Sequence, residues 1–220
     1  MIGREGVIMA DREYVGETTR VGAPEINQVA DPAPLGLGGF AFTTFLLSLT
    51  NAHVIKAGDG IVFGAAIFYG GIAQILAGMW EFRNNRNTFG AVAFTSYGAF
   101  WLTLFYLLTH LDQLTGTGSD IRVAVGAYLL AWAIFTFYMW IASLRLNGAL
   151  IAVFTLLLAT FAVLAIGWFA GTGPAPKSGL IKLGGWLGIL TAIAAWYLAA
   201  AIVINHTFKK AVLPVWPIAS

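Results

Sequence analysis

The hydrophobic residues of this 220-residue chain gather in six long stretches, separated by short segments that hold most of its charged residues. Each stretch is close to the ~20 residues that a helix needs to cross the hydrocarbon core of a bilayer. The stretches cover residues 35–54, 60–80, 90–109, 123–144, 149–169 and 183–204. A membrane β-barrel would instead show alternating segments of about ten residues, and the sequence has no such pattern. We therefore predict an all-α integral membrane protein with six transmembrane helices.

The composition agrees with a chain whose surroundings are mostly lipid. Of its residues, 59% are hydrophobic and 10% are charged, and its mean hydropathy is +0.80. Soluble domains carry about 25% charged residues. The net charge of +2 is too small to indicate a nucleic-acid partner. The absence of cysteine excludes disulfide frameworks and metal sites with thiolate ligands. We expect the lipid bilayer, and no nucleic acid, as the partner of the hydrophobic surface.

The charged residues divide the chain into one domain and two tails. Residues 1–30 mix arginines with acidic residues and lack an apolar centre, which predicts a partly disordered N-terminal tail. The six-helix domain would cover residues 31–207, and residues 208–220 would form a short C-terminal tail. Eight of the twelve lysines and arginines lie in the two tails and in the second and fourth loops. This bias predicts a multi-pass protein of the cell membrane with both termini, and so both tails, in the cytoplasm.

The first stretch opens with an unusual run, in which residues 31–40 read DPAPLGLGGF. Pro32 and Pro34 lack a backbone N–H and restrict the residues before them, so we expect a regular helix to begin at or after Pro34. Gly36 and the two glycines that follow it remove side chains from one helix surface. Another backbone or a small solute can then come close to this surface.

Two glycine pairs have the spacing of close helix contacts. Gly60 and Gly64 lie four residues apart at the start of the second stretch, and Gly184 and Gly188 lie four residues apart in the sixth. In a bilayer such faces let helices approach closely. The spacing alone fits packing within one protomer or between protomers, and both alternatives stay open.

Charged residues are absent from the middle of all six stretches. Transporters that depend on an intramembrane carboxylate, and pumps with a lysine-bound chromophore, normally carry such a residue. We therefore disfavour ion coupling through a buried carboxylate, and we expect neither an enzyme nor a cofactor.

Glu81, with Arg83 and Arg86, is interpreted as a charge cluster at the membrane edge, and a gating or proton-entry role is the alternative. Trp101 is interpreted as an interface anchor near a span end. The histidines share no spacing typical of a metal site, so no metal is expected.

The polarity inside the stretches is uncharged and concentrated in a few residues. Thr43, Thr44 and Ser48 lie within about a turn and a half of the first stretch. Serine and threonine in membrane helices most often bond to carbonyls of their own helix, which is the structural alternative for each of them. Gln74 differs, because a full amide in hydrocarbon needs a partner or a wet cavity. Gln74 is therefore a candidate to face a pore.

The opening run of residues 31–40 resembles the signature of the acetate uptake transporter family, which includes the bacterial succinate–acetate permeases. Further landmarks of that family are matched in order by residues 68–74, 87–90, 95–102, 133–136, 165–167 and 212–214. The resemblance covers about residues 30–216. One departure is Asp31, which stands where the family has asparagine.

The resemblance implies six-helix protomers that assemble as homohexamers, each with its own path for acetate or succinate. It implies a hydrophobic constriction formed by Phe40, Tyr97 and Leu157, with Thr43 and Gln74 as polar residues that line the path nearby. Pro32, Pro34 and Gly36 correspond to the structural part of the motif. A small carboxylate passing a narrow apolar ring needs a few hydrogen-bond donors, such as threonine, glutamine or a tyrosine hydroxyl, because complete desolvation is prohibitive.

The sequence leaves three questions of function open. The protein is either a channel for a partly hydrated anion or a proton-linked permease, and only about one molecule in 500 of a carboxylic acid is neutral at pH ~7. A six-helix assembly or sensor that transports nothing is the alternative from another class. Export of ammonium is a third reading, although the spans contain no convincing aromatic cage for a cation.

Overall fold

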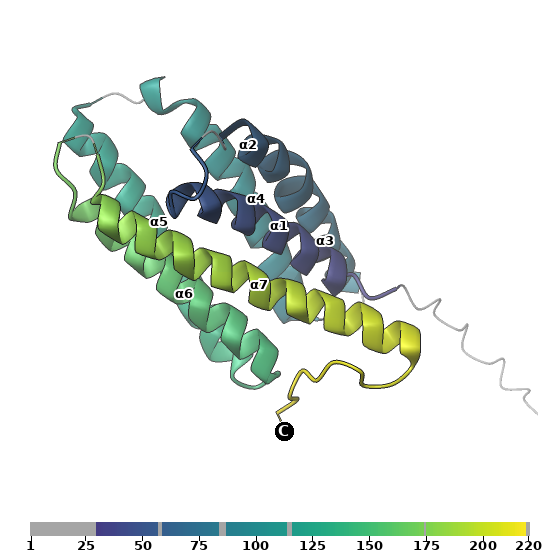
Figure 1. Cartoon of the computed structure of the whole chain (residues 1–220). Coiled ribbons are helices and arrows are strands. Elements are labelled where there is room, and N and C mark those ends of the chain that lie inside the picture. The colour runs from purple at the N-terminus through teal and green to yellow at the C-terminus, as the bar shows by residue number, and fades with distance from the viewer. Residues whose placement is uncertain (1–29, 57–58, 84–86, 114–115, 174, 219–220) are drawn as a thin grey trace, which may run out of the picture.

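The computed structural model describes residues 30–56, 59–83, 87–113, 116–173 and 175–218, and these residues are almost entirely helical (Figure 1). The elements are α1 (Ala33–Asn51), α2 (Asp59–Ile67), the π-helix η1 (Phe68–Ala73), α3 (Gln74–Arg83), α4 (Thr88–Thr109), the 3-10 helix η2 (Leu111–Gln113), α5 (Gly118–Ser143), α6 (Gly148–Phe169) and α7 (Ser178–Phe208). In the described part of the chain, six helical segments are long and apolar enough to cross a membrane, because α2, η1 and α3 together make one of them. The predicted fold class, with six transmembrane helices, is confirmed.

The motif at the start of α1 shapes the beginning of the helix. The helix begins at Ala33, one residue before the predicted position, and Pro34 stands in its first turn. Proline is tolerated there because the first N–H groups of a helix have no partner within it. The Oδ1 atom of Asp31 accepts the N–H of Ala33 at 2.9 Å. An aspartate thus supplies an oxygen acceptor at the position where the family has asparagine.

The helices form a bundle in which α1 is central. Its main partner is α7, and its other side packs against the segment of α2, η1 and α3. Helix α6 lies between α7 and α5, and α4 packs mainly on α3. Figure 1 shows the first turn of α1 and the last turn of α7 at the same end of the bundle. We call this the termini end.

The residues after α7 fold back onto the termini end. The Oδ1 atom of Asn205 accepts the N–H groups of Val212 and Leu213, which fixes the turn out of the helix. Further along, the N–H of Gly148, at the start of α6, donates to the carbonyl of Trp216. This segment therefore covers the beginning of α6.

The two glycine pairs have different surroundings. A side chain at Gly184 would overlap Leu164 of α6, and one at Gly188 would overlap Ser48 of α1. By contrast, among the described residues nothing beyond their own helix backbone and chain neighbours lies within 4 Å of the positions where Gly60 and Gly64 would carry a Cβ. The pair in α7 therefore packs within the protomer, whereas the pair in α2 has an open face.

The π-helix interrupts the second span just before Gln74. In η1 a wider turn replaces the regular α-helical one. A Cβ at Gly70 would lie 2.6 Å from Oγ1 of Thr43 and 2.8 Å from Cδ1 of Trp101, so only a glycine fits between α1 and α4 at this point. The contact holds the wide turn in the middle of the bundle.

Candidate functional site

Two cavities lie on either side of Phe40 and Leu157 in the bundle. The first, of about 160 Å³, is lined by residues of α1, α3, α4, α6 and α7, and by Val215 of the segment after α7. The second, of about 110 Å³, is lined by residues of α1, α4, α5 and α6. We call them the termini-side cavity and the far-side cavity. Phe40 and Leu157 line both cavities, so these two side chains lie between them.

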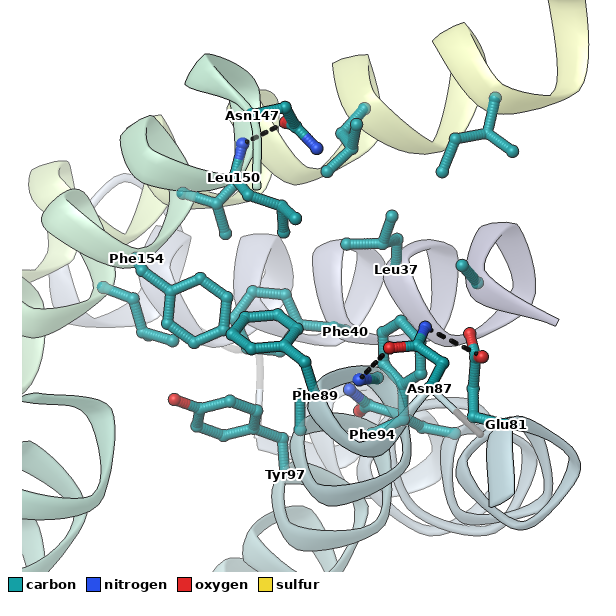
Figure 2. Close-up of a pocket in the computed structure, with 18 of the residues that line it drawn as sticks. Leu37, Phe40, Glu81, Asn87, Phe89, Phe94, Tyr97, Asn147, Leu150 and Phe154 are labelled. Atoms are coloured by element: carbon teal, nitrogen blue, oxygen red, sulfur yellow. Dashed lines mark hydrogen bonds between the residues drawn. The ribbon is translucent and has the colours of Figure 1, made fainter. Parts of the chain in front are cut away.

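The residues predicted as a constriction come together at this junction. Phe40, Tyr97 and Leu157 are all buried. The rings of Phe40 and Tyr97 are 5.6 Å apart between centroids, and Tyr97 also packs on Phe154 at 6.3 Å. Figure 2 shows these three rings at the inner end of the termini-side cavity. The junction is therefore a set of packed apolar side chains from α1, α4 and α6.

The hydroxyl of Tyr97 is directed towards α5. It lies 2.9 Å from Oγ1 of Thr136 on α5. Because Thr136 donates its own proton to the carbonyl of Trp132, Tyr97 is the donor in this pair. The donor expected from Tyr97 is thus already used, and the constriction presents carbon atoms.

Gln74 lies where the sequence argument places it, at the wall of a cavity. Its side chain is 1% exposed and lines the termini-side cavity. Among the described residues, neither Nε2 nor Oε1 of Gln74 has a hydrogen-bond partner. Leaving a buried amide unpaired costs about 1–3 kcal/mol, so Gln74 has hydrogen-bonding capacity that the described residues do not use.

Thr43 occupies a different place from the one that the resemblance implies. Its hydroxyl donates to the carbonyls of Gly39, at 3.0 Å, and Ala65, at 3.3 Å. Thr43 is not among the residues that line either cavity. The reason is geometric, because this side of α1 faces α2 and η1. The next residue, Thr44, lines the far-side cavity, and its Oγ1 has no partner among the described residues.

The glycine of the opening motif has a packing role. A Cβ at Gly36 would lie 2.5 Å from Cδ1 of Phe94 on α4. Phe94 lines the termini-side cavity, so the missing side chain at Gly36 lets this ring reach the wall.

Glu81 was interpreted as part of a charge cluster at the membrane edge, with a gating or proton-entry role as the alternative. Its side chain is 1% exposed and lines the termini-side cavity, so it faces the protein interior. Arg83 is exposed, and Arg86 lies outside the described residues. A signal was available, because Gln74, Ala77, Gly78 and Glu81 have the spacing of one helix face and are the buried residues of α3.

An asparagine caps the N-terminus of each of the two helices, α4 and α6, that begin beside this cavity. The Oδ1 atom of Asn87 accepts the N–H of Gly90, and its Nδ2 atom donates to Oε2 of Glu81 at 2.9 Å (Figure 2). At the start of α6, Oδ1 of Asn147 accepts the N–H of Leu150 at 2.9 Å. Each helix start is thus satisfied by an amide that also lines the cavity.

Trp101 was wrongly interpreted as an interface anchor. It is 1% exposed and lines the far-side cavity, and its Nε1 has no partner among the described residues. Its place towards the end of the span suggested a membrane interface. In the fold its ring packs on Phe100 and beside Gly70 of η1 instead.

Comparison with known proteins places this geometry among transport proteins. The pattern of the GPR1/FUN34/yaaH family matches residues 16–220. The chain is 44% identical over 189 residues to the "Succinate-acetate/proton symporter SatP" of Escherichia coli K12. This alignment covers 86% of this chain and 96% of that protein. It is 40% identical over 208 residues to the "Ammonia transport outward protein 2" of Saccharomyces cerevisiae, covering 91% of this chain and 72% of that one. Its structure resembles that of a bacterial acetate channel, SatP, with a TM-score of 0.76 and 43% identity over 85% of this chain and 99% of that one.

Proposed function

Because the chain belongs to the GPR1/FUN34/yaaH family, we propose that it carries small carboxylates, acetate and by analogy succinate, across a cell membrane. The observation that supports this most directly is the pair of cavities that meet at Phe40 and Leu157. The path would run through each protomer, with Phe40, Tyr97 and Leu157 as its constriction.

The proposed path offers a carboxylate a limited number of hydrogen bonds at the point of greatest desolvation. Gln74 would donate through Nε2 on one side of the constriction, since its amide is unpartnered among the described residues. On the other side, Thr44 and Trp101 would donate through Oγ1 and Nε1. Thr43 would act indirectly, by holding α1 against the second span. These donors offset part of the cost of removing water from the carboxylate.

The proposal includes an assembly and an orientation. We propose a homohexamer, by analogy with the family, in which the open face of Gly60 and Gly64 contacts a neighbouring protomer. Both termini would lie in the cytoplasm, with residues 1–30 and 208–220 as short tails of the transport domain. The termini-side cavity would then open towards the cytoplasm.

Uptake of labelled acetate into liposomes tests the proposed function. Vesicles that contain the purified protein should take up acetate faster than empty vesicles, and an excess of unlabelled acetate should compete. Labelled methylammonium in the same vesicles separates carboxylate transport from ammonium transport. Uptake of methylammonium alone, or uptake equal to that of empty vesicles with a correctly assembled oligomer, would contradict the proposal.

A further inference from the structure

The termini-side cavity holds a buried carboxyl group that the proposed transport of carboxylates does not require. Glu81 is 1% exposed and lines this cavity together with Gln74. An ionised glutamate repels a carboxylate that enters the same space, because two such charges at short distance cannot both be accommodated. A carboxyl group at this position is therefore compatible with an entering carboxylate only if a proton neutralises one of the two groups.

The two oxygens of the Glu81 carboxyl group have different surroundings. Oε2 accepts a hydrogen bond from Nδ2 of Asn87. The orientation of that amide is fixed, because its Oδ1 accepts the N–H of Gly90 at 3.1 Å. Oε1 has no hydrogen-bond partner among the described residues. One oxygen is held in place by Asn87, and the other keeps a hydrogen-bonding capacity that the described residues do not use.

The surrounding helices make room for this carboxyl group. A Cβ at Gly90 would lie 3.0 Å from Oε1 of Glu81 and 2.7 Å from Nδ2 of Asn87, so the absence of a side chain at Gly90 permits the arrangement. In Figure 2, Glu81 and Asn87 lie on one side of the cavity, across from Phe154 and Leu150. Residues of α3 and of the first turn of α4 together fix the position of the Glu81 carboxyl group.

The charged groups near Glu81 can be named for each packed element. Asp31, just before α1, acts on it through space as a like charge. The first turn of α4 contributes the neutral amide of Asn87 and the positive end of a helix dipole. On α3 itself the next charged residue is Arg83, which is exposed.

We propose that Glu81 and the transported carboxylate share one proton in the termini-side cavity, which links movement of the substrate to a proton. Protonated Glu81 donates from Oε1 to an entering carboxylate. Alternatively, an entering carboxylic acid donates its O–H to Oε1 of ionised Glu81. If the proton moves fully, the O–H bond of the acid breaks as the O–H bond of Glu81 forms, and the reverse transfer releases the neutral acid. The inference rests on the proposed function and adds to it the residue that makes carriage proton-dependent.

The first test uses Glu81→Gln, because glutamine keeps the size and can always donate from its amide. Acetate uptake per assembled oligomer is measured in liposomes between pH ~6 and pH ~8, after subtraction of the leak into empty vesicles. The rate of acetate uptake by the wild type should fall steeply as the pH rises, and the fall should approach the tenfold change per pH unit of a titrating carboxyl group. Glu81→Gln should retain transport and lose most of this slope. In addition, its uptake should respond to a K⁺ diffusion potential, since the anion would then pass without a proton.

Two further variants separate titration from structure. Arg83→Gln removes an exposed charge two residues away and should keep the wild-type pH profile. Asn87→Asp retains an oxygen that can accept the N–H of Gly90 and places a second carboxyl beside Glu81. Because like charges favour a shared proton, the pH of half-maximal uptake should rise by about one unit.

The outcomes are distinguishable. A Glu81→Gln protein that keeps the wild-type pH slope, or that assembles and does not transport, overturns the shared proton, as does an unshifted profile in Asn87→Asp. If Glu81→Gln fails to assemble, the Asn87→Asp profile decides the question. Wild-type uptake equal to that of empty vesicles would instead refute the proposed function itself.

Discussion

The two cavities on either side of Phe40 and Leu157 differ in the chemistry of their walls. The termini-side cavity contains one carboxyl group, that of Glu81, and three amides, those of Gln74, Asn87 and Asn147. The far-side cavity is polar through hydroxyl groups, one amide and two indoles, with Thr44, Ser48, Asn51, Trp101, Tyr128, Thr160 and Trp168. Only the first wall includes a carboxyl group, whose charge can change with protonation.

From this difference we infer that the two cavities would act differently on a solute, with Phe40 and Leu157 between them. Much of the polarity in the far-side cavity is already used, since Thr160 donates to the carbonyl of Leu156 and Tyr128 to that of Phe100. Thr44 and Trp101 keep unpartnered groups in the described structure. In the proposed path the far side would therefore offer neutral hydrogen bonds to a solute, whereas the termini side would also distinguish the charge of the solute.

The largest effect is expected from Gln74→Leu, which removes the amide of the termini-side cavity. Loss of a donor to a charged group costs about 1.5–3 kcal/mol, so the acetate concentration for half-maximal uptake should rise about 10- to 100-fold. Uptake is measured per assembled oligomer, and Ile72→Leu, at an exposed position of the same span, is the control. An unchanged acetate dependence would mean that Gln74 only supports packing.

The second change removes the boundary between the cavities. Leu157→Ala joins the two spaces, and we expect uptake of a larger acid such as lactate to increase about tenfold. In a packed core the same truncation costs about 2–5 kcal/mol of stability, so thermal stability is measured in parallel. Leu158→Ala is the matched control, because Leu158 does not line either cavity. Exclusion of lactate as in the wild type would show that Leu157 does not set the size limit.

A smaller effect is expected on the far side from Trp101→Phe. The variant retains an aromatic ring and loses the unpartnered N–H. One hydrogen bond is worth about 1 kcal/mol, so acetate affinity should fall about fivefold. Trp196→Phe, in α7 and outside both walls, should leave affinity unchanged. An effect as large as that of Gln74→Leu would contradict the inferred difference between the two cavities.

The smallest effect on transport is expected from Tyr97→Phe. Because the hydroxyl of Tyr97 donates to Thr136 on α5, its loss should lower the free energy of unfolding by about 1 kcal/mol. Acetate uptake should stay within about twofold of the wild type, since the ring itself is kept. Thermal denaturation and uptake are measured on the same preparations. A strong loss of uptake at unchanged stability would assign the hydroxyl to the path.

The fold could be predicted because lipid allows few solutions. Six uncharged stretches of suitable length leave helices as the way to satisfy the backbone, and six such spans are observed among the described residues. The constriction residues were found through the motifs that carry the family resemblance. Their roles in transport remain predictions, although the structure brings Phe40, Tyr97 and Leu157 together.

The sequence could not predict those features that depend on which neighbouring helix a side chain contacts. The glycine pairs in α2 and α7 have identical spacing, yet only the pair in α7 packs inside the protomer. Thr43 and Thr44 are adjacent, yet they face different partners. The nearby arginines favoured a charge cluster at the membrane edge as the interpretation of Glu81, whereas its position on the buried face of α3 turns it towards the interior of the protein.

The π-helix also determines which changes of chain length this span can accept. A π turn holds about one residue more than an α turn, so the residues of η1 take up an extra residue without moving the helices on either side. Deleting one residue between Phe68 and Ala73 should restore a regular helix and leave Gln74 and Glu81 on the cavity face. One residue deleted from the regular helix α3 would instead rotate Glu81 by about 100° relative to Gln74. The wide turn is thus the place where this membrane span can change its length and keep its two polar residues aligned.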